Sequence, residues 1–246
     1  MPLFVSFWNC TLSAGWQDKS FAERITALGA AAFNANLEAR ARRAALWLFV
    51  APEYAFAGPD QGDAKPAEQV PATDETTLTG MLSALTHRYD NLLIAPGTIA
   101  VKEGPASARK ARNTSHAYHG GNPVWNFSKC RGVGEVTAEE ARFKLLVFRP
   151  GLGSATATVA GTLFGAEICA DATGTGTLGQ AVAVHVVLGQ GVGAVTIQNR
   201  ATQYLVVADA AAYGVYDYRP GHGGAPVASY KHEDSLGTRL YYYDLP

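Results

Sequence analysis

Cysteine is scarce in this sequence, with three residues in 246: Cys10, Cys130 and Cys169. Three thiols cannot all pair with one another, and no two of them have the C-x-x-C spacing of a zinc or redox motif. The cysteines therefore imply neither a disulfide framework nor a zinc site. For the reaction that the motifs below imply, we expect no metal and no organic cofactor. So few cysteines suit a reducing compartment, and we expect the protein to be cytoplasmic.

Charge and long apolar runs are scarce as well. Charged residues make up 17% of the chain, below the usual quarter, and the formal net charge is −1. Without a basic patch we expect no nucleic-acid partner, and without a secretory leader or a span of membrane length we expect no membrane partner. The low charge instead favours a large core and a buried interface between subunits.

The first hundred residues alternate between strand and helix patterns. Buried strands are predicted at Leu3–Asn9, Ala45–Glu53 and Asn91–Ala100, where aromatic and branched residues run together. Between them, helical spacing covers Phe21–Ala45 and Thr73–Asp90, with Thr73 or Asp74 as the cap of the second helix. This order predicts an α/β layer structure. We find no linker or repeat and expect one domain over residues 1–246.

The rest of the chain is richer in strand patterns. Two short strands flank a His-Gly-Gly-Asn turn at 119–122, which predicts a hairpin. Further strands are expected up to Cys169, and Val195–Ala201 is expected to be helical. The polar, aromatic tail after Pro226 is expected to form edge strands.

Three ionisable residues follow buried strands: Glu53 after "WLFVAP", Lys129 after "VWNFS" and Cys169 after "TLFGAEI". Chemistry in layered α/β folds gathers at such strand ends. A thiolate is a nucleophile, a carboxylate can take its proton, and a lysine can stabilise an oxyanion. The backbone N–H of Ala170 is a natural second oxyanion donor, and Tyr54 is placed to line a pocket, although each residue alone has a plain structural reading.

The segments "FVAPEYAF", "NPVWNFSK" and "GTLFGAEICADA", in this order, resemble the nitrilase superfamily of carbon–nitrogen hydrolases. The resemblance implies an α-β-β-α sandwich of two mixed sheets with helices outside. It also implies that Glu53 is the general base, Lys129 the oxyanion stabiliser and Cys169 the nucleophile. The family often has a second glutamate after the lysine, and here we favour Glu140 over its alternatives, Glu135 and Glu139.

The resemblance further implies hydrolysis of a small amide or carbamoyl compound, or less readily of a nitrile, through a thioester on Cys169. It implies a homodimer or a larger homo-oligomer. The segment "ATGTGTLGQ" after Asp171 departs from the family pattern, and so does Ala170, where many relatives have an aromatic residue. Two alternatives stay open: a non-catalytic or regulatory protein with this fold, and an acyltransferase that uses the same triad.

Overall fold

The structure is a computed structural model. It describes residues 2–10, 15–16, 18–57, 70–105, 109–132, 146–192, 196–235 and 238–246. Within these ranges the chain forms two α-helices, α1 (Phe21–Ala41) and α2 (Ala72–Arg88), and two β-sheets. Neither described helix combines the length and the apolar character that crossing a membrane requires.

The first sheet is mixed, and strands from the two ends of the chain lie side by side in it. The strand β1 (Leu3–Asn9) pairs in parallel with β2 (Leu46–Val50) and antiparallel with β16 (Thr238–Leu245). The strand order is β15-β16-β1-β2-β4-β6-β5-β3, and β7 and β8 also pair with β6. The remaining bounds are β3 (Val70–Pro71), β4 (Leu92–Ala95), β5 (Thr98–Glu103), β6 (Arg109–His119), β7 (Asn122–Ser128), β8 (Leu146–Phe148) and β15 (Lys231–Ser235).

The second sheet is also mixed and has the order β14-β13-β12-β11-β10-β9. Its central strands β10, β11 and β12 run parallel, and its outer strands pair antiparallel. The bounds are β9 (Ser154–Val159), β10 (Thr162–Ile168), β11 (Val182–Gly189), β12 (Ala201–Asp209), β13 (Gly214–Asp217) and β14 (Ala225–Val227).

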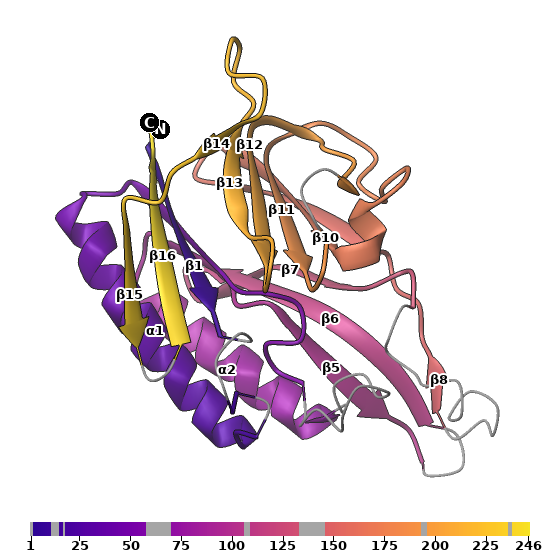
Figure 1. Ribbon diagram of the computed structural model, residues 1–246. Coiled ribbons are helices and arrows are strands. Elements are labelled where there is room, and N and C mark those ends of the chain that lie inside the picture. The colour runs from indigo at the N-terminus through magenta and orange to yellow at the C-terminus, as the bar shows by residue number, and fades with distance from the viewer. Residues whose placement is uncertain are drawn as a thin grey trace.

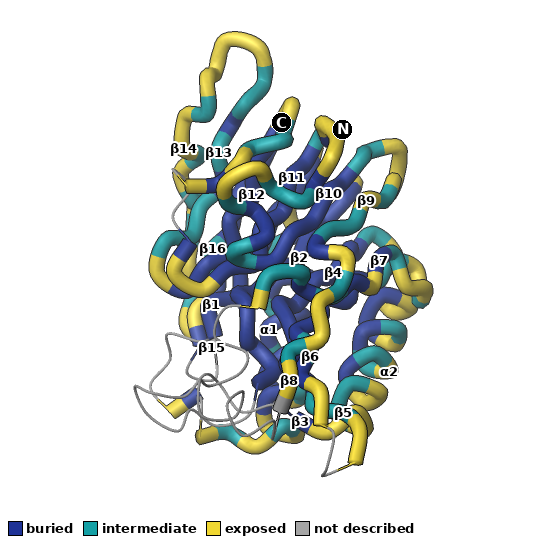
Figure 2. Tube along the Cα trace, turned by 90° about the vertical axis from the view of Figure 1, so that its right-hand side faces the viewer, coloured by how far each residue is buried: buried dark blue, intermediate teal, exposed yellow. Residues whose placement is uncertain are grey.

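The two sheets pack face to face, and the two helices cover the outer face of the first sheet (Figure 1). Apolar side chains from both sheets, such as Val5, Leu48, Phe164 and Val186, fill the layer between them. The tube in Figure 2 shows this layer as buried backbone running through the middle of the molecule. The sandwich of two mixed sheets is therefore confirmed.

The second sheet has a different cover from the one that the sequence predicts. The predicted helix at Val195–Ala201 is wrong. Val195 lies outside the described residues, Ile197 forms a β-bridge with Thr173, residues 198–200 are irregular and β12 already begins at Ala201. Within the described residues, Ala172 at the end of a single 3₁₀ turn and the loop residues Val192 and Ile197 pack on the outer face of this sheet instead. Loops replace helices here because the segments after β10 and β11 are rich in glycine and threonine and lack a repeating apolar face.

Local sequence explains the elements that position the site. At the start of α1, Ser20 and Glu23 form a capping box. The predicted hairpin is confirmed: Gly120 and Gly121, both with positive φ, join β6 to β7. The cap of α2 is Pro71, two residues before Thr73 and three before Asp74, the positions that the sequence suggests.

Candidate active site

Glu53 lies in a tight turn directly after β2. Its backbone N–H donates to Gly189 O on the second sheet (3.2 Å), so the turn bridges the two sheets. The next residue, Tyr54, has a left-handed φ of 60°, and its N–H donates to Thr98 Oγ1 (2.9 Å). A Cβ at Gly97 would lie 2.1 Å from the Pro52 carbonyl oxygen, so only glycine lets the two chain segments approach this closely.

Glu53 and Lys129 form a buried ion pair. Lys129 Nζ lies 2.7 Å from Glu53 Oε1, and each side chain is 1% exposed. Asn113 on β6 donates from its side-chain Nδ2 to the same carboxylate oxygen (2.8 Å). The backbone carbonyl of Asn113 accepts a hydrogen bond from the backbone N–H of Lys129 (2.8 Å). A buried charge pair needs such extra hydrogen bonds to offset the loss of hydration. Asn113 therefore belongs to the site, although the sequence analysis did not select it.

Cys169 is the first residue after β10 and begins the short 3₁₀ helix η1 (Cys169–Ala172). Its φ of 47° is left-handed, which is uncommon for a residue with a side chain and is typical of functional turns. The thiol shares a hydrogen bond with the Glu53 side chain, and Sγ lies 4.0 Å from Gln190 O. The structure thus brings Glu53, Lys129 and Cys169 together.

The surroundings keep the Cys169 thiol protonated. Burial and the negative charge of Glu53 raise the pKa of Cys169 to about 12, although the nearby Lys129 ammonium opposes this rise. A thiol in this state is a poor nucleophile by itself. A carboxylate that is hydrogen-bonded to such a thiol can accept its proton, and Glu53 is in this position.

Asp171, two residues after the cysteine, holds the segment that carries Lys129. Its carboxylate accepts the backbone N–H groups of Cys130 (2.7 Å) and Arg131 (2.8 Å). In return, Arg131 Nη1 donates to Ala170 O (3.1 Å) and Thr173 O (3.0 Å). These reciprocal bonds fix the turn after Cys169 against the turn after Lys129. They explain the aspartate of the motif as a positioning group.

The other predicted site residues have different outcomes. Ala170 lies within η1, and its expected role as an oxyanion donor stays a prediction. The Tyr54 ring centroid lies 5.8 Å from Lys129 Nζ, so the ring is beside the ion pair. The predicted second carboxylate, Glu140, and its alternatives lie outside the described residues. In the part of the chain that the structure describes, no group of three or more His, Cys, Asp or Glu side chains could hold a metal ion.

Neither a protein-family model nor a curated protein sequence matches this chain. Solved structures do match it. The amidase from Nesterenkonia sp. AN1 in complex with acrylamide has a TM-score of 0.63 at 16% identity, over 100% of this chain and 90% of the amidase chain. Saccharomyces cerevisiae Nit3, a member of branch 10 of the nitrilase superfamily, has a TM-score of 0.62 at 17% identity, over 99% and 90%.

This chain has the nitrilase-superfamily fold. Another structure of the Nesterenkonia protein, described as an amidase from the nitrilase superfamily, has a TM-score of 0.64 at 15% identity, over 100% of this chain and 90% of that one. Two further structures of that amidase carry acrylamide, or the acetamide moiety of fluoroacetamide, at the active-site cysteine.

One more buried pair, Glu167 with His185, lies next to the site. Glu167, two residues before Cys169, accepts hydrogen bonds from Thr177 Oγ1 (2.8 Å), Leu178 N (2.8 Å) and His185 Nε2 (2.9 Å). His185 Nδ1 accepts the Arg200 N–H (3.3 Å), so the imidazole proton lies on Nε2 and points to Glu167. The pair anchors the loop after the cysteine, whose sequence departs from the family pattern.

Proposed function

We propose that this protein hydrolyses the C–N bond of a small amide, with Cys169 as nucleophile, Glu53 as general base and Lys129 as stabiliser of the oxyanion. The observation that carries the proposal is the buried contact of a thiol, a carboxylate and an ammonium. Glu53 Oε1 forms an ion pair with Lys129 Nζ (2.7 Å), and the Glu53 carboxylate is hydrogen-bonded to the Cys169 thiol. The likeness to amidases of known structure supports the same reading.

In the proposed reaction, Cys169 Sγ attacks the amide carbon while its proton passes to Glu53. The carbonyl oxygen becomes an oxyanion, which Lys129 Nζ and the backbone N–H of Ala170 would stabilise. Glu53 then returns the proton to the nitrogen, the C–N bond breaks, and ammonia or an amine leaves a thioester on Cys169. Water, deprotonated by Glu53, releases the carboxylate and restores the thiol.

A screen for ammonia release tests the proposal. Acetamide, propionamide, acrylamide and fluoroacetamide represent small amides, and acetonitrile represents nitriles. We expect release from at least one amide, and we expect Cys169→Ala to lower it by about a thousandfold or more because the nucleophile is lost. Cys130→Ala is the matched control, since Cys130 contributes only its backbone N–H to the site and should keep its activity.

The same assay separates the two alternatives. Activity that survives in Cys169→Ala would contradict the proposed mechanism. A wild-type protein that releases no ammonia and gains no acetamide adduct on Cys169 after treatment with fluoroacetamide would indicate a non-catalytic protein. Transfer of the acyl group to added hydroxylamine in preference to water would indicate an acyltransferase that uses the same three residues.

A further inference from the structure

The three central strands of the second sheet have their carboxyl ends at one edge, because β10, β11 and β12 run parallel. Cys169 directly follows β10, and Gly189 and Asp209 end β11 and β12 side by side. Asp209 follows an apolar run, as the three candidate site residues do, and it is fully buried. A buried carboxylate needs hydrogen-bond partners that offset the loss of hydration. The partners of Asp209 connect it to the candidate site.

Asp209 accepts hydrogen bonds from two loops. Its Oδ2 accepts the backbone N–H of Val192 (2.7 Å), in the loop after β11. Its Oδ1 accepts the backbone N–H groups of Ala211 (2.9 Å) and Ala212 (3.0 Å), in the turn after β12. Hydrogen bonds to an ionised group are stronger than those between neutral groups, so they fix the loops that donate them. The Asp209 side chain therefore joins the end of β11 to the end of β12.

The Gly189–Val192 segment, which Asp209 holds at its far end, contacts both the candidate base and the candidate nucleophile. The Gly189 carbonyl accepts the Glu53 backbone N–H (3.2 Å), and the Gln190 carbonyl oxygen lies 4.0 Å from Cys169 Sγ. Val192 belongs to an apolar cluster against which Cys169 also packs. The position of this segment therefore affects the turn that carries Glu53 and the surroundings of the thiol at once.

We propose that Asp209 is a positioning residue of the candidate active site, which acts through the Gly189–Val192 segment to hold the Glu53 carboxylate against the Cys169 thiol. This role rests on the function proposed above, because the contact is the one through which Glu53 would take the thiol proton. Such a transfer needs hydrogen-bond distance between the two groups. Asp209 binds the segment and takes no part in the proton transfer itself.

Asp209→Asn tests the role with little change in size. An amide has one acceptor oxygen, which should stay with the two donors in the turn after β12, so the hydrogen bond from Val192 is lost. Burial and the Glu53 charge raise the pKa of Cys169 to about 12, and both causes weaken when the segment loosens. Alkylation of Cys169 by iodoacetamide at pH 8 should therefore become about tenfold faster, because more of the thiol is ionised. Peptide mass spectrometry measures this rate, with Cys130 as the internal reference.

Turnover should change in the opposite direction. On the best amide of the ammonia screen, kcat of Asp209→Asn should fall about tenfold with little change in KM, because Glu53 is no longer held against the thiol. A purely structural role would lower only the folded fraction, which thermal unfolding measures. Faster alkylation together with slower turnover in a folded variant is therefore specific to a positioning role.

Gly189→Ala disrupts the same contact from the neighbouring strand. A Cβ at Gly189 would lie 2.8 Å from Asp209 Oδ2, so the carboxylate would have to move away from Val192. This variant leaves the Asp209 side chain in the protein and should reproduce both changes, faster alkylation of Cys169 and a lower kcat. It also keeps the test decisive if Asp209→Asn does not fold.

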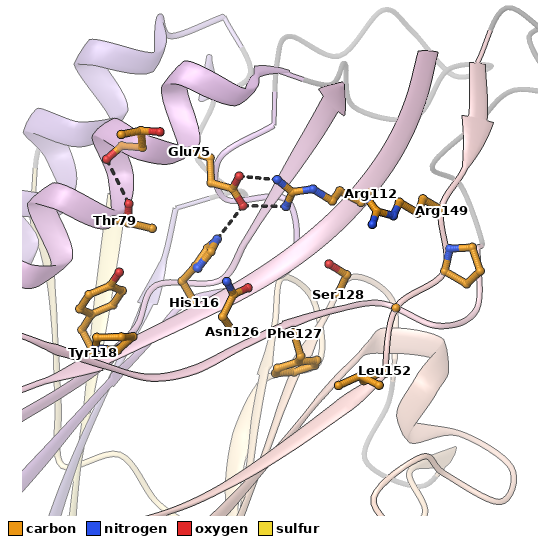
Figure 3. A pocket seen from close by; sticks show the side chains of 14 residues that line it. Glu75, Thr79, Arg112, His116, Tyr118, Asn126, Phe127, Ser128, Arg149 and Leu152 are labelled. Carbon is orange, nitrogen blue, oxygen red and sulfur yellow. Dashed lines mark hydrogen bonds and ion pairs between the residues drawn. The ribbon is translucent and has the colours of Figure 1, made fainter. Parts of the chain in front are cut away.

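Two other carboxylates serve as controls. Asp217→Asn is the matched control, because its Oδ1 also accepts a backbone N–H two residues further on (Arg219, 2.9 Å), whereas Asp217 lies beside the amino-terminal half of β12. Glu75→Gln is the second control, because Arg112 binds Glu75 on the outward face of the first sheet (Figure 3). Both residues lie away from the Gly189–Val192 segment, so neither control should change alkylation or turnover by more than about twofold.

The outcomes separate this role from the proposed function. A wild type that releases no ammonia would contradict the proposed function, whereas alkylation of Cys169 can still be measured in that protein and decides the role of Asp209. An unchanged alkylation rate in folded Asp209→Asn and Gly189→Ala would overturn the positioning role. So would faster alkylation with an unchanged kcat on an amide that the wild type hydrolyses.

Discussion

The strand β6 supplies side chains to two glutamate clusters, one on each face of the first sheet. Asn113 points inward and binds Glu53, whereas its neighbour Arg112 and the alternate residue His116 point outward and bind Glu75. Alternation along a strand produces this division. Both clusters combine a carboxylate, a cation and a further hydrogen-bonding side chain, so their differences bear on why a proton-transfer role is proposed for one carboxylate and not for the other.

The first difference is how the cation holds the carboxylate. Arg112 grips both oxygens of Glu75 as a fork, and His116 adds a third contact. Lys129 and Asn113 both bind Oε1 of Glu53, which also hydrogen-bonds the Cys169 thiol. A guanidinium that binds both oxygens of a carboxylate stabilises its ionised form, so such a carboxylate is a poor proton acceptor. A carboxylate in contact with a thiol can instead accept the proton of that thiol.

The largest expected effect contrasts the same substitution in the two clusters. Glu53→Gln should lower kcat/KM for the best amide by about a thousandfold, because the amide cannot accept the Cys169 proton. Glu75→Gln should change kcat/KM less than threefold, because Glu75 lies on the other face of the sheet. Steady-state ammonia release measures both. Similar losses in the two variants would show that the clusters are not functionally distinct.

The next effect concerns acid stability. The pKa of Glu75 is lowered from 4.5 to about 2 in the folded protein. The ionised carboxylate therefore adds its full share to the free energy of unfolding above pH 4.5, and this share is lost as the pH falls toward 2. The difference in unfolding free energy between the wild type and Glu75→Gln should therefore shrink by on the order of 2 kcal/mol between pH 5 and pH 3. Denaturant unfolding at both pH values measures it. A difference that is independent of pH would contradict this account.

The smallest effect sharpens the role of Asn113. Asn113→Leu keeps the size of the side chain but removes a donor to Glu53, so kcat/KM should fall about tenfold. The acidic limb of the pH–rate profile should also move to higher pH, because the charged form of Glu53 loses a hydrogen bond. Thr114→Val, one residue along β6, is the matched control. An unchanged profile in Asn113→Leu would give Asn113 a purely structural role.

Sequence alone predicted the strand ends that meet at the site. Glu53, Lys129 and Cys169 each follow an apolar run. The first follows β2 in one sheet and the third follows β10 in the other, and the hydrogen bond from Glu53 N–H to Gly189 O, at the end of β11, joins the two sheets at this edge. The roles of the three residues stay proposals. Asn113 was missed because a single polar residue in an alternating strand has no distinctive pattern. Its importance comes from the pairing of β6 with β7, which places it beside Lys129.

The segments that pack on the outer face of the second sheet could not be predicted from the sequence, for a different reason. Predicting a helix at Val195–Ala201 assumed that a parallel crossover contains a helix, as most do. Here Gln198 N–H donates to Ala172 O (2.8 Å), so the loop after β11 is held by the turn after Cys169. Long-range contacts of this kind leave no local periodicity. The cap of α2 was misplaced by a smaller margin, because Pro71 carries no side-chain capping signal.

The hydrogen bonds of Glu167 have a consequence for local unfolding. One buried carboxylate binds Thr177 and Leu178 directly, and through His185 it is connected to Arg200. Breaking these bonds one at a time would leave a buried charge uncompensated, so they should open together. The cover of the second sheet would then act as a cooperative unit that can open while both sheets stay intact, and its hinge would lie two residues from Cys169.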